Sequence, residues 1–387
     1  MRKLHIINLE KMGGVERLFL QYIRHESAQN DAIFCISNQV GPEIAQYLTD
    51  KKITFVNRIF NALALKFPSF LRKYALQFKT WRARPDAIIV WDLVPVFAHA
   101  PSRGKVIYYD HGCSWRYPHN QKTLAFFAML SGCISAAHAS KRVMELRFQL
   151  PCPVNVVINR ILPPPDINSG EKAPRTPLRL GVAARLVGLK GISVALLAVK
   201  TLRERNVDVE LEIAGKGPDE ENFKALAVKL GIADCVTFLG FQSNLSSFFN
   251  RIHIYLSTPV TEPFGLSCME ALFYGVPVVF PLIDGQPEVV RDGYCGLGII
   301  PTVSPETHFG LSGVNVNFPY HVYSPTQDTL VPPMLMSHEA CADAIQAIAG
   351  DDYQTFRNNA FEHVRRNFDY RNFVGDFNNA IIGIVND

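Results

Sequence analysis

Mainly apolar runs of four to six residues recur along the chain, with longer stretches of mixed character between them. In the first half, the runs that predict strands cover residues 4–9, 32–37, 53–56, 86–91, 105–110, 133–136 and 154–158. Residues 15–25 have the pattern of a helix that follows the first run after a glycine pair. Apolar strands that alternate with helices are typical of a parallel sheet covered on both faces. The first half therefore predicts an α/β domain.

The same alternation begins again after a connector that contains Pro163-Pro164-Pro165 and the charged stretch 172–177. The second half has predicted strands at 178–183, 210–214 and 236–240, and predicted helices at 192–205 and 220–230. This βαβαβ order is typical of a Rossmann-like domain. We therefore predict a first domain over 1–165, a linker over 166–177 and a second domain over 178–366, followed by a separate C-terminal stretch over 367–387.

The composition agrees with two hydrophobic cores and with a cytoplasmic location. The chain has 387 residues, of which 48% are hydrophobic, enough to bury more than one core. Eight cysteines are scattered without a C-x-x-C pair, which favours reduced thiols in a cytoplasmic protein. The longest uncharged stretch, residues 123–140, is interrupted by small and polar residues and predicts a buried helix that runs into a strand.

Charge is distributed unevenly between the halves. Residues 1–170 contain 22 Lys and Arg against 11 Asp and Glu, a net of +11, whereas the remainder has a net of −7. Residues 51–84 contain nine basic residues and no acidic one, interleaved with aromatic residues. This pattern favours an interfacial helix on an anionic membrane surface. A nucleic-acid surface, or a core helix with a solvated basic face, would give a similar pattern.

The stretch from Thr261 to Phe280 has the strongest functional pattern. Glu262 follows the apolar run 252–257, and Glu270 lies eight residues later inside a predicted helix that extends from Gly265 to Gly275. A glycine at a helix start lets backbone N–H groups approach an anion, which the helix dipole also favours. Two carboxylates beside such a site can accept hydrogen bonds from sugar hydroxyls on either side of a phosphate. The alternative is a pair of solvated charges near a helix start.

Three other places have residues suited to binding a phosphate or a sugar. Arg185 and Lys190 lie on one loop closed by Gly191 and could bind a diphosphate. His111 follows a predicted strand at the sheet edge where ligands of α/β proteins bind. Gly13 and Gly14 form the turn after the first strand. The chain has no D-x-D sequence, so we expect neither a metal ion nor another cofactor.

Taken together, these residues resemble those of GT-B glycosyltransferases, specifically retaining glycosyltransferase family 4 (group 1). The residues that carry the resemblance are Gly13-Gly14, His111, Arg185, Lys190-Gly191, Gly215-x-Gly217, Val236-x-Phe238-x-Gly240 and Glu262-x₇-Glu270. The resemblance implies two Rossmann-like domains that face each other across a cleft. It also implies that residues 367–387 form a helix that returns to the first domain.

The resemblance implies a role for each site residue. Arg185 and Lys190 would bind the donor diphosphate, and Glu270 would bind the ribose. Glu262 would contact the transferred sugar. The other donor-binding positions would be Phe264, Gly265 and Leu266, which lie beside the diphosphate, and Gly13 and Gly14, which would close over the donor or the acceptor. His111 would touch the donor sugar and complete the catalytic set with Glu262, Arg185 and Lys190.

The resulting expectation is a metal-independent, retaining hexosyltransferase that uses a UDP- or GDP-sugar. A glycan or lipid-linked acceptor at the inner face of a bacterial plasma membrane would agree with the basic segment 51–84, and we expect no nucleic-acid partner. A GT-B epimerase or phosphorylase, and a non-catalytic membrane-binding module, are alternatives. Three features depart from the family pattern. Asn159 is followed by Arg160 instead of glycine, and His111 is followed by Gly112 instead of an acidic residue. Residues 298–337 predict an additional hairpin on the acceptor side.

Overall fold

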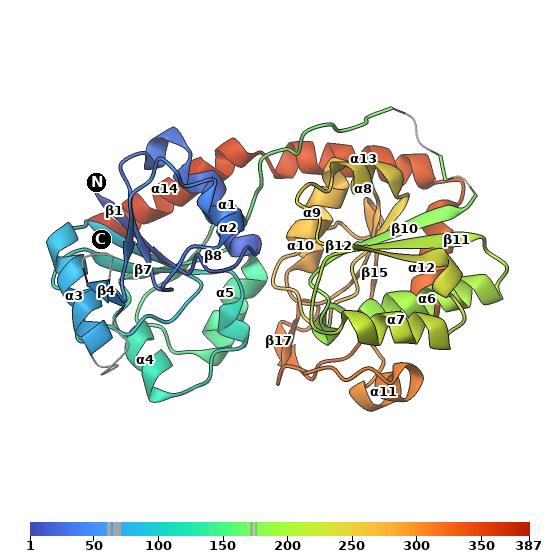
Figure 1. Ribbon diagram of the computed structural model, residues 1–387, viewed down its shortest axis with the longest axis horizontal. Coiled ribbons are helices and arrows are strands. Elements are labelled where there is room, and N and C mark those ends of the chain that lie inside the picture. The colour runs from blue at the N-terminus through green and yellow to red at the C-terminus, as the bar shows by residue number, and fades with distance from the viewer. Residues whose placement is uncertain (60–62, 65–70, 171–172, 175) are drawn as a thin grey trace. The chain divides into compact units, whose positions relative to one another are not determined.

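The computed structural model describes residues 1–59, 63–64, 71–170, 173–174 and 176–387 (Figure 1). The chain divides into two compact units. Unit 1 comprises Met1–Leu162 and Tyr370–Asp387, and unit 2 comprises Pro163–Asp369. Each unit has its own parallel sheet covered by helices, which confirms the predicted class of two Rossmann-like α/β domains.

The sheet of unit 1 contains seven parallel strands in the order β3-β2-β1-β6-β7-β8-β9. Their bounds are β1 (Lys3–Ile7), β2 (Ala32–Cys35), β3 (Ile53–Phe55), β6 (Ala87–Trp91), β7 (Lys105–Asp110), β8 (Gly132–Ser135) and β9 (Val154–Val156). Each strand falls on one of the predicted apolar runs. Because all seven strands are parallel, their carboxyl ends lie along one edge of the sheet and their amino ends along the other.

Helices cover both faces of this sheet. They are α1 (Gly14–Ile23), α2 (Pro42–Ala45), α3 (Leu71–Ala83), α4 (Gln121–Phe127), α5 (His138–Arg147) and α14 (Tyr370–Asn386). Phe19 of α1, Trp91 of β6 and Phe377 of α14 belong to one buried cluster, so the C-terminal helix completes the core of unit 1 (Figure 1). Burial of each such side chain contributes about 1.5–3 kcal/mol.

Unit 2 contains six parallel strands in the order β12-β11-β10-β13-β14-β15. Their bounds are β10 (Leu178–Ala183), β11 (Val209–Ala214), β12 (Val236–Gly240), β13 (Ile254–Leu256), β14 (Val278–Pro281) and β15 (Gly296–Ile299). The helices are α6 (Ile192–Glu204), α7 (Glu220–Lys229), α8 (Ser246–Arg251), α9 (Leu266–Phe273), α10 (Gln286–Val289), α11 (Pro305–Ser312), α12 (His338–Ala349) and α13 (Tyr353–Asn367).

A buried arginine fixes the far end of α9. Arg357 of α13 is 1% exposed, and its guanidinium donates hydrogen bonds to the carbonyl oxygens of Tyr274 and Gly275. The last carbonyl groups of a helix lack N–H donor partners within the helix, and a cation there also complements the helix dipole. Arg357 therefore holds α9, which carries Glu270, against the body of unit 2.

Residues 298–337 contain the predicted hairpin together with a helix. The antiparallel strands β16 (Val322–Ser324) and β17 (Thr329–Val331) form the hairpin, and α11 precedes it. His308 of α11 is buried, and its Nε2 lies 2.8 Å from Oγ of Ser193 in α6. This contact ties the insertion to the core of unit 2. A role of the insertion toward the acceptor stays a prediction.

The basic segment 51–84 is only partly helical. Its first residues form β3 and the short antiparallel pair β4 (Arg58–Ile59) and β5 (Leu63–Ala64), whereas α3 begins at Leu71. Residues 60–62 and 65–70, including Lys66, lie outside the described residues. Lys79 points inward, and its Nζ donates hydrogen bonds of 2.5 Å to the carbonyl oxygens of Phe55 and Arg58. It supports the fold, which corrects its assignment to a basic surface.

Among the described residues, none of the helices has the length and apolar character required to cross a membrane.

Candidate active site

The loop after β10 carries both predicted cations, and side chains from other parts of unit 2 hold its backbone in place. The N–H of Gly188 donates to Oδ2 of Asp219 at 2.8 Å, and Oγ1 of Thr258 donates to the carbonyl oxygen of Gly191 at 2.8 Å. Gly191 has a φ of +63°, and a Cβ there would lie 1.7 Å from the carbonyl oxygen of Thr258. Only glycine fits such a close approach, so this loop has little freedom to move.

A second glycine turn packs against the first part of the same loop. A Cβ on Gly215 would lie 1.9 Å from the carbonyl oxygen of Ala184, and one on Gly217 would lie 2.1 Å from that of Leu186. The two backbones therefore touch directly on either side of Arg185. The side chain of Arg185 is exposed and forms no ion pair with a carboxylate in the described part of the chain. This cation remains available to a ligand.

Lys190 and Glu262, which are 72 residues apart, form a direct ion pair. Nζ of Lys190 lies 2.5 Å from Oε2 of Glu262, and the two side chains are 32% and 20% exposed. The partial exposure allows both groups to contact a ligand as well as each other. The structure thus brings together one predicted diphosphate-binding residue and the residue predicted to contact the transferred sugar.

Asp284 holds the Glu262 loop in place, and sequence reasoning missed it. It is 1% exposed, follows β14, and accepts hydrogen bonds at Oδ2 from the N–H of Glu262 at 2.9 Å and from Oγ1 of Thr261 at 2.7 Å. Its Oδ1 accepts from the N–H of Tyr323 in β16 at 2.8 Å. One carboxylate therefore connects the 298–337 insertion to Glu262. Its place just beyond the end of an apolar strand is a signal that could have identified it.

Helix α9 begins where the sequence predicted an anion site. Gly265 has a φ of +103° and precedes Leu266, the first helical residue. The first N–H groups of a helix have no acceptor within it and can bind an anion. Glu270 lies one turn beyond Leu266 on the same side of the helix. The ring of Phe264 is buried, with its centroid 6.4 Å from that of Phe368, so this residue supports the loop from the core side.

In unit 1, the glycine turn after β1 lies against an acidic side chain. Gly13 precedes α1, and a Cβ on Gly13 would lie 2.7 Å from Oε2 of Glu16. Burial raises the pKa of Glu16 to about 7, and the charge of Asp92 adds to this shift. Carboxylates with a pKa near neutrality are common at functional sites. Glu16 was not predicted, although its place in the first turn after the glycine pair was a signal for it.

His111 follows β7 at the carboxyl edge of the same sheet. Its ring stacks on Trp91 with centroids 5.6 Å apart, and its backbone N–H donates to Oδ1 of Asp92 at 2.9 Å. Burial lowers the pKa of His111 to about 4, so the ring is neutral near pH 7. Nδ2 of Asn159 lies 3.4 Å from Nδ1 of His111, which assigns the ring proton to Nε2. Within the described residues this buried Nε2 has no hydrogen-bond partner, so it can donate to a ligand.

The raised pKa of Glu16 predicts a pH-dependent cost to stability. A carboxyl group whose folded-state pKa is raised from 4.5 to about 7 contributes stability at low pH that is lost as the pH rises from 4.5 to 7. We expect Glu16→Gln to be more stable than the wild type at pH 8 by about 1–3 kcal/mol, and equally stable at pH 4.5. Urea unfolding at the two pH values measures this difference.

Glu10→Gln is the matched control, because it removes an exposed carboxylate a few residues before the same helix. We expect Glu10→Gln to follow the wild-type pH profile. A constant difference between Glu16→Gln and the wild type at both pH values would contradict the assigned titration.

No cluster of three or more His, Cys, Asp or Glu side chains that could hold a metal ion is found among the residues that the structure describes. The expectation of metal independence stays a prediction.

Comparison with known proteins shows which families and folds this chain is similar to. Residues 166–308 match the sequence family described as glycosyl transferases group 1. The chain is 26% identical over 299 residues to an uncharacterized glycosyltransferase of Haemophilus influenzae, covering 74% of this chain and 82% of that protein. It is 24% identical over 299 residues to the lipopolysaccharide core biosynthesis glycosyltransferase LpsD of Rhizobium meliloti, covering 75% and 81% of the two chains.

The fold is also similar to that of a solved structure. Anabaena Alr3699/HepE, crystallised with UDP and glucose, superposes with a TM-score of 0.73 at 16% sequence identity. The superposition covers 99% of this chain and 100% of that one. Residues 166–308 therefore match the glycosyl transferases group 1, and the chain as a whole has the GT-B fold of two Rossmann-like domains.

Proposed function

We propose that this protein is a retaining glycosyltransferase of family 4 that transfers a hexose-type sugar from a nucleotide-diphosphate sugar to an envelope glycan or lipid-linked acceptor. The observation that carries the proposal is the 2.5 Å ion pair between Lys190 and Glu262. It combines a cation for a phosphate and an acceptor for sugar hydroxyls in one place. The start of α9, with Glu270 one turn further on, follows Glu262 directly in the chain.

On the donor side, the role of unit 2 is electrostatic. Arg185 and Lys190 would neutralise the diphosphate, together with the N–H groups of Gly265 and Leu266 at the start of α9. Negative charge on the diphosphate increases as the sugar leaves, so fixed cations and dipoles stabilise the transition state more than the ground state. Glu270 would accept hydrogen bonds from the ribose hydroxyls.

At the sugar, retention follows from attack on the same face. Departure of the diphosphate leaves an oxocarbenium-like sugar, and the acceptor hydroxyl forms the new C–O bond on the side from which the phosphate left. The leaving phosphate oxygen takes the hydroxyl proton, so no protein nucleophile is required. Glu262 would accept hydrogen bonds from the sugar. The neutral ring of His111 would donate from Nε2 to a sugar hydroxyl.

Two comparisons narrow the substrates within this proposal. The similar structure of HepE was solved with UDP and glucose, which favours UDP over GDP as the nucleotide of the donor. The relative LpsD acts in lipopolysaccharide core biosynthesis, which favours an acceptor of the bacterial cell envelope. We accordingly propose that the reaction takes place at the inner face of the plasma membrane.

Nucleotide binding tests the proposal. UDP present at about 100 times its Kd stabilises the folded state by about 2.7 kcal/mol. For a unit of this size, that free energy corresponds to an increase in Tm of roughly 5–10 °C. We expect UDP and a UDP-sugar to raise Tm in this way, and GDP and ADP to have smaller effects. Unchanged Tm values with every nucleotide would contradict the donor site.

Product analysis separates transfer from the other GT-B reactions. Incubation with a UDP-sugar and an envelope glycan should yield UDP and a glycan extended by one sugar with the anomeric configuration of the donor. An isomerised UDP-sugar would indicate an epimerase, and a phosphate-dependent sugar phosphate would indicate a phosphorylase. Equal rates with and without EDTA are expected for a metal-independent enzyme, and restoration of an EDTA-inhibited rate by Mg²⁺ would contradict metal independence.

A further inference from the structure

We propose that unit 1 carries a docking surface for an anionic phospholipid bilayer, formed by one face of α3 and a cationic pocket at the amino-terminal edge of the sheet. The surface has two parts. The aromatic stripe consists of Leu71, Tyr74, Phe78 and Trp81, and the cationic pocket is formed around Arg2, Arg84, Arg103 and Lys105. The inference does not depend on the proposed sugar transfer.

The aromatic stripe is an apolar face of α3 that the described part of unit 1 leaves largely uncovered. Its residues are spaced by three, four and three positions, which places all four on one side of a helix. Their side chains are exposed by 38% for Leu71, 48% for Tyr74, 58% for Phe78 and 49% for Trp81. The opposite side of α3 packs on unit 1 through Leu76 and Thr80, which are buried. Four large apolar side chains in line on one exposed helix face indicate an interaction site.

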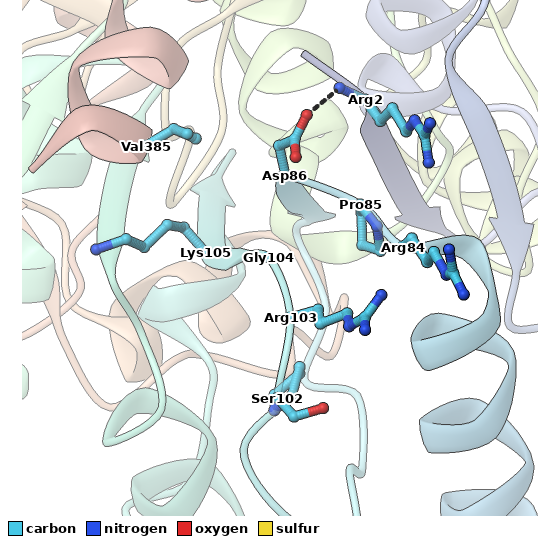
Figure 2. A pocket seen from close by; sticks show the side chains of 10 residues that line it. Arg2, Arg84, Pro85, Asp86, Ser102, Arg103, Gly104, Lys105 and Val385 are labelled. Atoms are coloured by element: carbon cyan, nitrogen blue, oxygen red, sulfur yellow. Dashed lines mark hydrogen bonds between the residues drawn. The ribbon is translucent and has the colours of Figure 1, made fainter.

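The cationic pocket lies where α3 ends. It is an open cavity of about 590 Å³, and its lining includes Arg2, Arg84, Arg103 and Lys105. Arg84 follows directly after Ala83, the last residue of α3, so the pocket lies at the carboxyl-terminal end of the helix that carries the stripe. Figure 2 shows Arg2, Arg84 and Arg103 extending to the same side of the pocket, while Lys105 extends on the side of Val385.

The pocket contains more basic than acidic side chains. Asp86 is the one acidic residue in the lining, and its Oδ2 accepts a hydrogen bond of 2.7 Å from the backbone N–H of Arg2. None of the four basic side chains forms an ion pair with a carboxylate among the described residues. Four cations against one carboxylate leave a net charge of +3 in the pocket. A group with several anionic oxygens, such as a phosphate, complements that charge.

This pocket is separate from the candidate active site. Arg2 precedes β1, Arg84 precedes β6, and Lys105 begins β7, so the pocket lies at the amino ends of three neighbouring parallel strands. Gly13 and His111 follow the carboxyl ends of strands in the same sheet. Strands of five or six residues separate the two edges by roughly 15–20 Å. A phosphate bound in the pocket is therefore not the phosphate of a donor at the carboxyl edge.

The combination favours a bilayer over a nucleic acid. An interfacial helix needs an apolar face to enter the region of the acyl chains and basic residues to contact the phosphates. Leu71 and Phe78 of the stripe provide the apolar face, and the pocket provides the basic residues. Phe78 and Trp81 stack on each other with centroids 6.1 Å apart and planes 28° apart, so each already covers a face that a base would use.

The net charge of unit 1 supports an anionic partner. The unit contains 23 Lys and Arg against 12 Asp and Glu, a net of +11, whereas unit 2 has 16 against 23, a net of −7. An anionic surface therefore attracts unit 1 and repels unit 2. The attraction is screened by salt, because the Debye length falls from about 30 Å at 0.01 M to about 3 Å at 1 M.

Vesicle flotation of the full chain tests the proposal. We expect the wild type to float with vesicles of phosphatidylcholine that contain about 30 mol% phosphatidylglycerol, and to remain unbound with phosphatidylcholine alone. Each basic side chain at an anionic surface contributes about a fivefold gain in partition, so Arg84→Gln/Arg103→Gln should bind about 25-fold more weakly. Phe78→Ser/Trp81→Ser should lose at least tenfold through its missing apolar contact.

Matched controls separate the surface from general charge and apolarity. Arg116→Gln/Lys122→Gln removes two exposed positive charges from unit 1 away from the pocket, and Leu124→Ser removes an exposed apolar side chain of α4. Both should change partition by less than about threefold. Equal loss of binding in the pocket variant and in the charge control would overturn the pocket. Equal loss in the stripe variant and in Leu124→Ser would overturn the stripe.

Competition identifies the source of the phosphate. Inorganic phosphate at the ionic strength of a chloride control should displace the protein no more than chloride does, because the stripe also holds it to the bilayer. Displacement by phosphate alone would indicate a free-anion site and overturn the bilayer proposal. Tighter binding to a single-stranded oligonucleotide than to anionic vesicles would overturn it in favour of nucleic acid. The Tm of the Arg84→Gln/Arg103→Gln variant should still rise with UDP. Such a rise, together with lost vesicle binding, shows that the variant keeps its donor site and has lost only the docking surface.

Discussion

Replacing Lys190 with alanine is expected to lower kcat/KM for the nucleotide-sugar by about 10²–10³-fold, the effect of removing one preorganised group that stabilises charge in a transition state. Lys190 is the fixed cation whose Nζ lies 2.5 Å from Glu262, so its loss removes a phosphate partner and leaves the charge of Glu262 uncompensated. The fold should survive, because a partly exposed ion pair contributes only about 0–1 kcal/mol to stability. Steady-state kinetics and Tm measure both effects.

Lys200→Ala is the matched control for this substitution. Lys200 lies on α6 of the same unit, is 42% exposed and forms an ion pair of 3.3 Å with Glu204 within the helix. It removes a paired lysine from the same unit without touching the loop after β10. We expect wild-type kcat/KM for Lys200→Ala and a partial recovery of activity for Lys190→Arg. If Lys190→Ala transfers sugar as fast as Lys200→Ala, the assignment of Lys190 to the diphosphate is wrong.

Much of the fold could be predicted from periodicity, because parallel strands buried on both faces leave a clear apolar run in the sequence. The strands β1, β6 and β7 each coincide with such a run. Segment 51–84 was harder to interpret. Its basic and aromatic residues favoured an interfacial helix, but the helix α3 begins only at Leu71, and residues 53–55, which the apolar pattern had marked as a strand, pair with β2. The local composition does not reveal this pairing, since it depends on a neighbouring strand that is about twenty residues away.

The site was predictable to the extent that it depends on glycine. Gly191, Gly215 and Gly265 have φ values that favour glycine, and the sequence marks each of them with a glycine in a turn. The residues that pattern reasoning missed act through burial. Glu16 acquires its raised pKa from the fold around it, and Asp284 acquires its role from three donors that meet there. The identity of an acidic residue in the sequence does not show which hydrogen-bond donors the fold will place beside it.

Asp284 should therefore be the position where one substitution affects both stability and the proposed chemistry. In Asp284→Asn, the side chain keeps its shape and tolerates the φ of +48°, but its NH₂ group faces N–H or O–H donors on one side. A buried donor left without an acceptor, combined with the lost charge, costs about 2–4 kcal/mol. For a unit of this size the Tm should fall by roughly 5–15 °C.

Asp328→Asn provides a matched control from the same hairpin. Asp328 has the same φ of +48°, is exposed, and accepts a hydrogen bond of 2.8 Å from the hydroxyl group of Tyr323. Because solvent can replace this contact, we expect its Tm to change by no more than about 2 °C. A result in which Asp284→Asn and Asp328→Asn have the same Tm would mean that the three hydrogen bonds to Asp284 add little.

The kinetic consequence of Asp284→Asn distinguishes a positioning residue from a merely structural one. The N–H of Glu262 loses its fixed acceptor, so the Glu262 carboxylate is held less well against the sugar, whereas Arg185 and the start of α9 keep their places. Binding of the nucleotide depends on the latter groups, and progress to the transition state depends on Glu262. We therefore expect kcat to fall at least tenfold at a temperature well below the Tm, with KM for the nucleotide-sugar changed by less than about threefold. A rise in KM at constant kcat would place the effect on donor binding instead, and would contradict the assignment of Asp284 to the sugar side of the site.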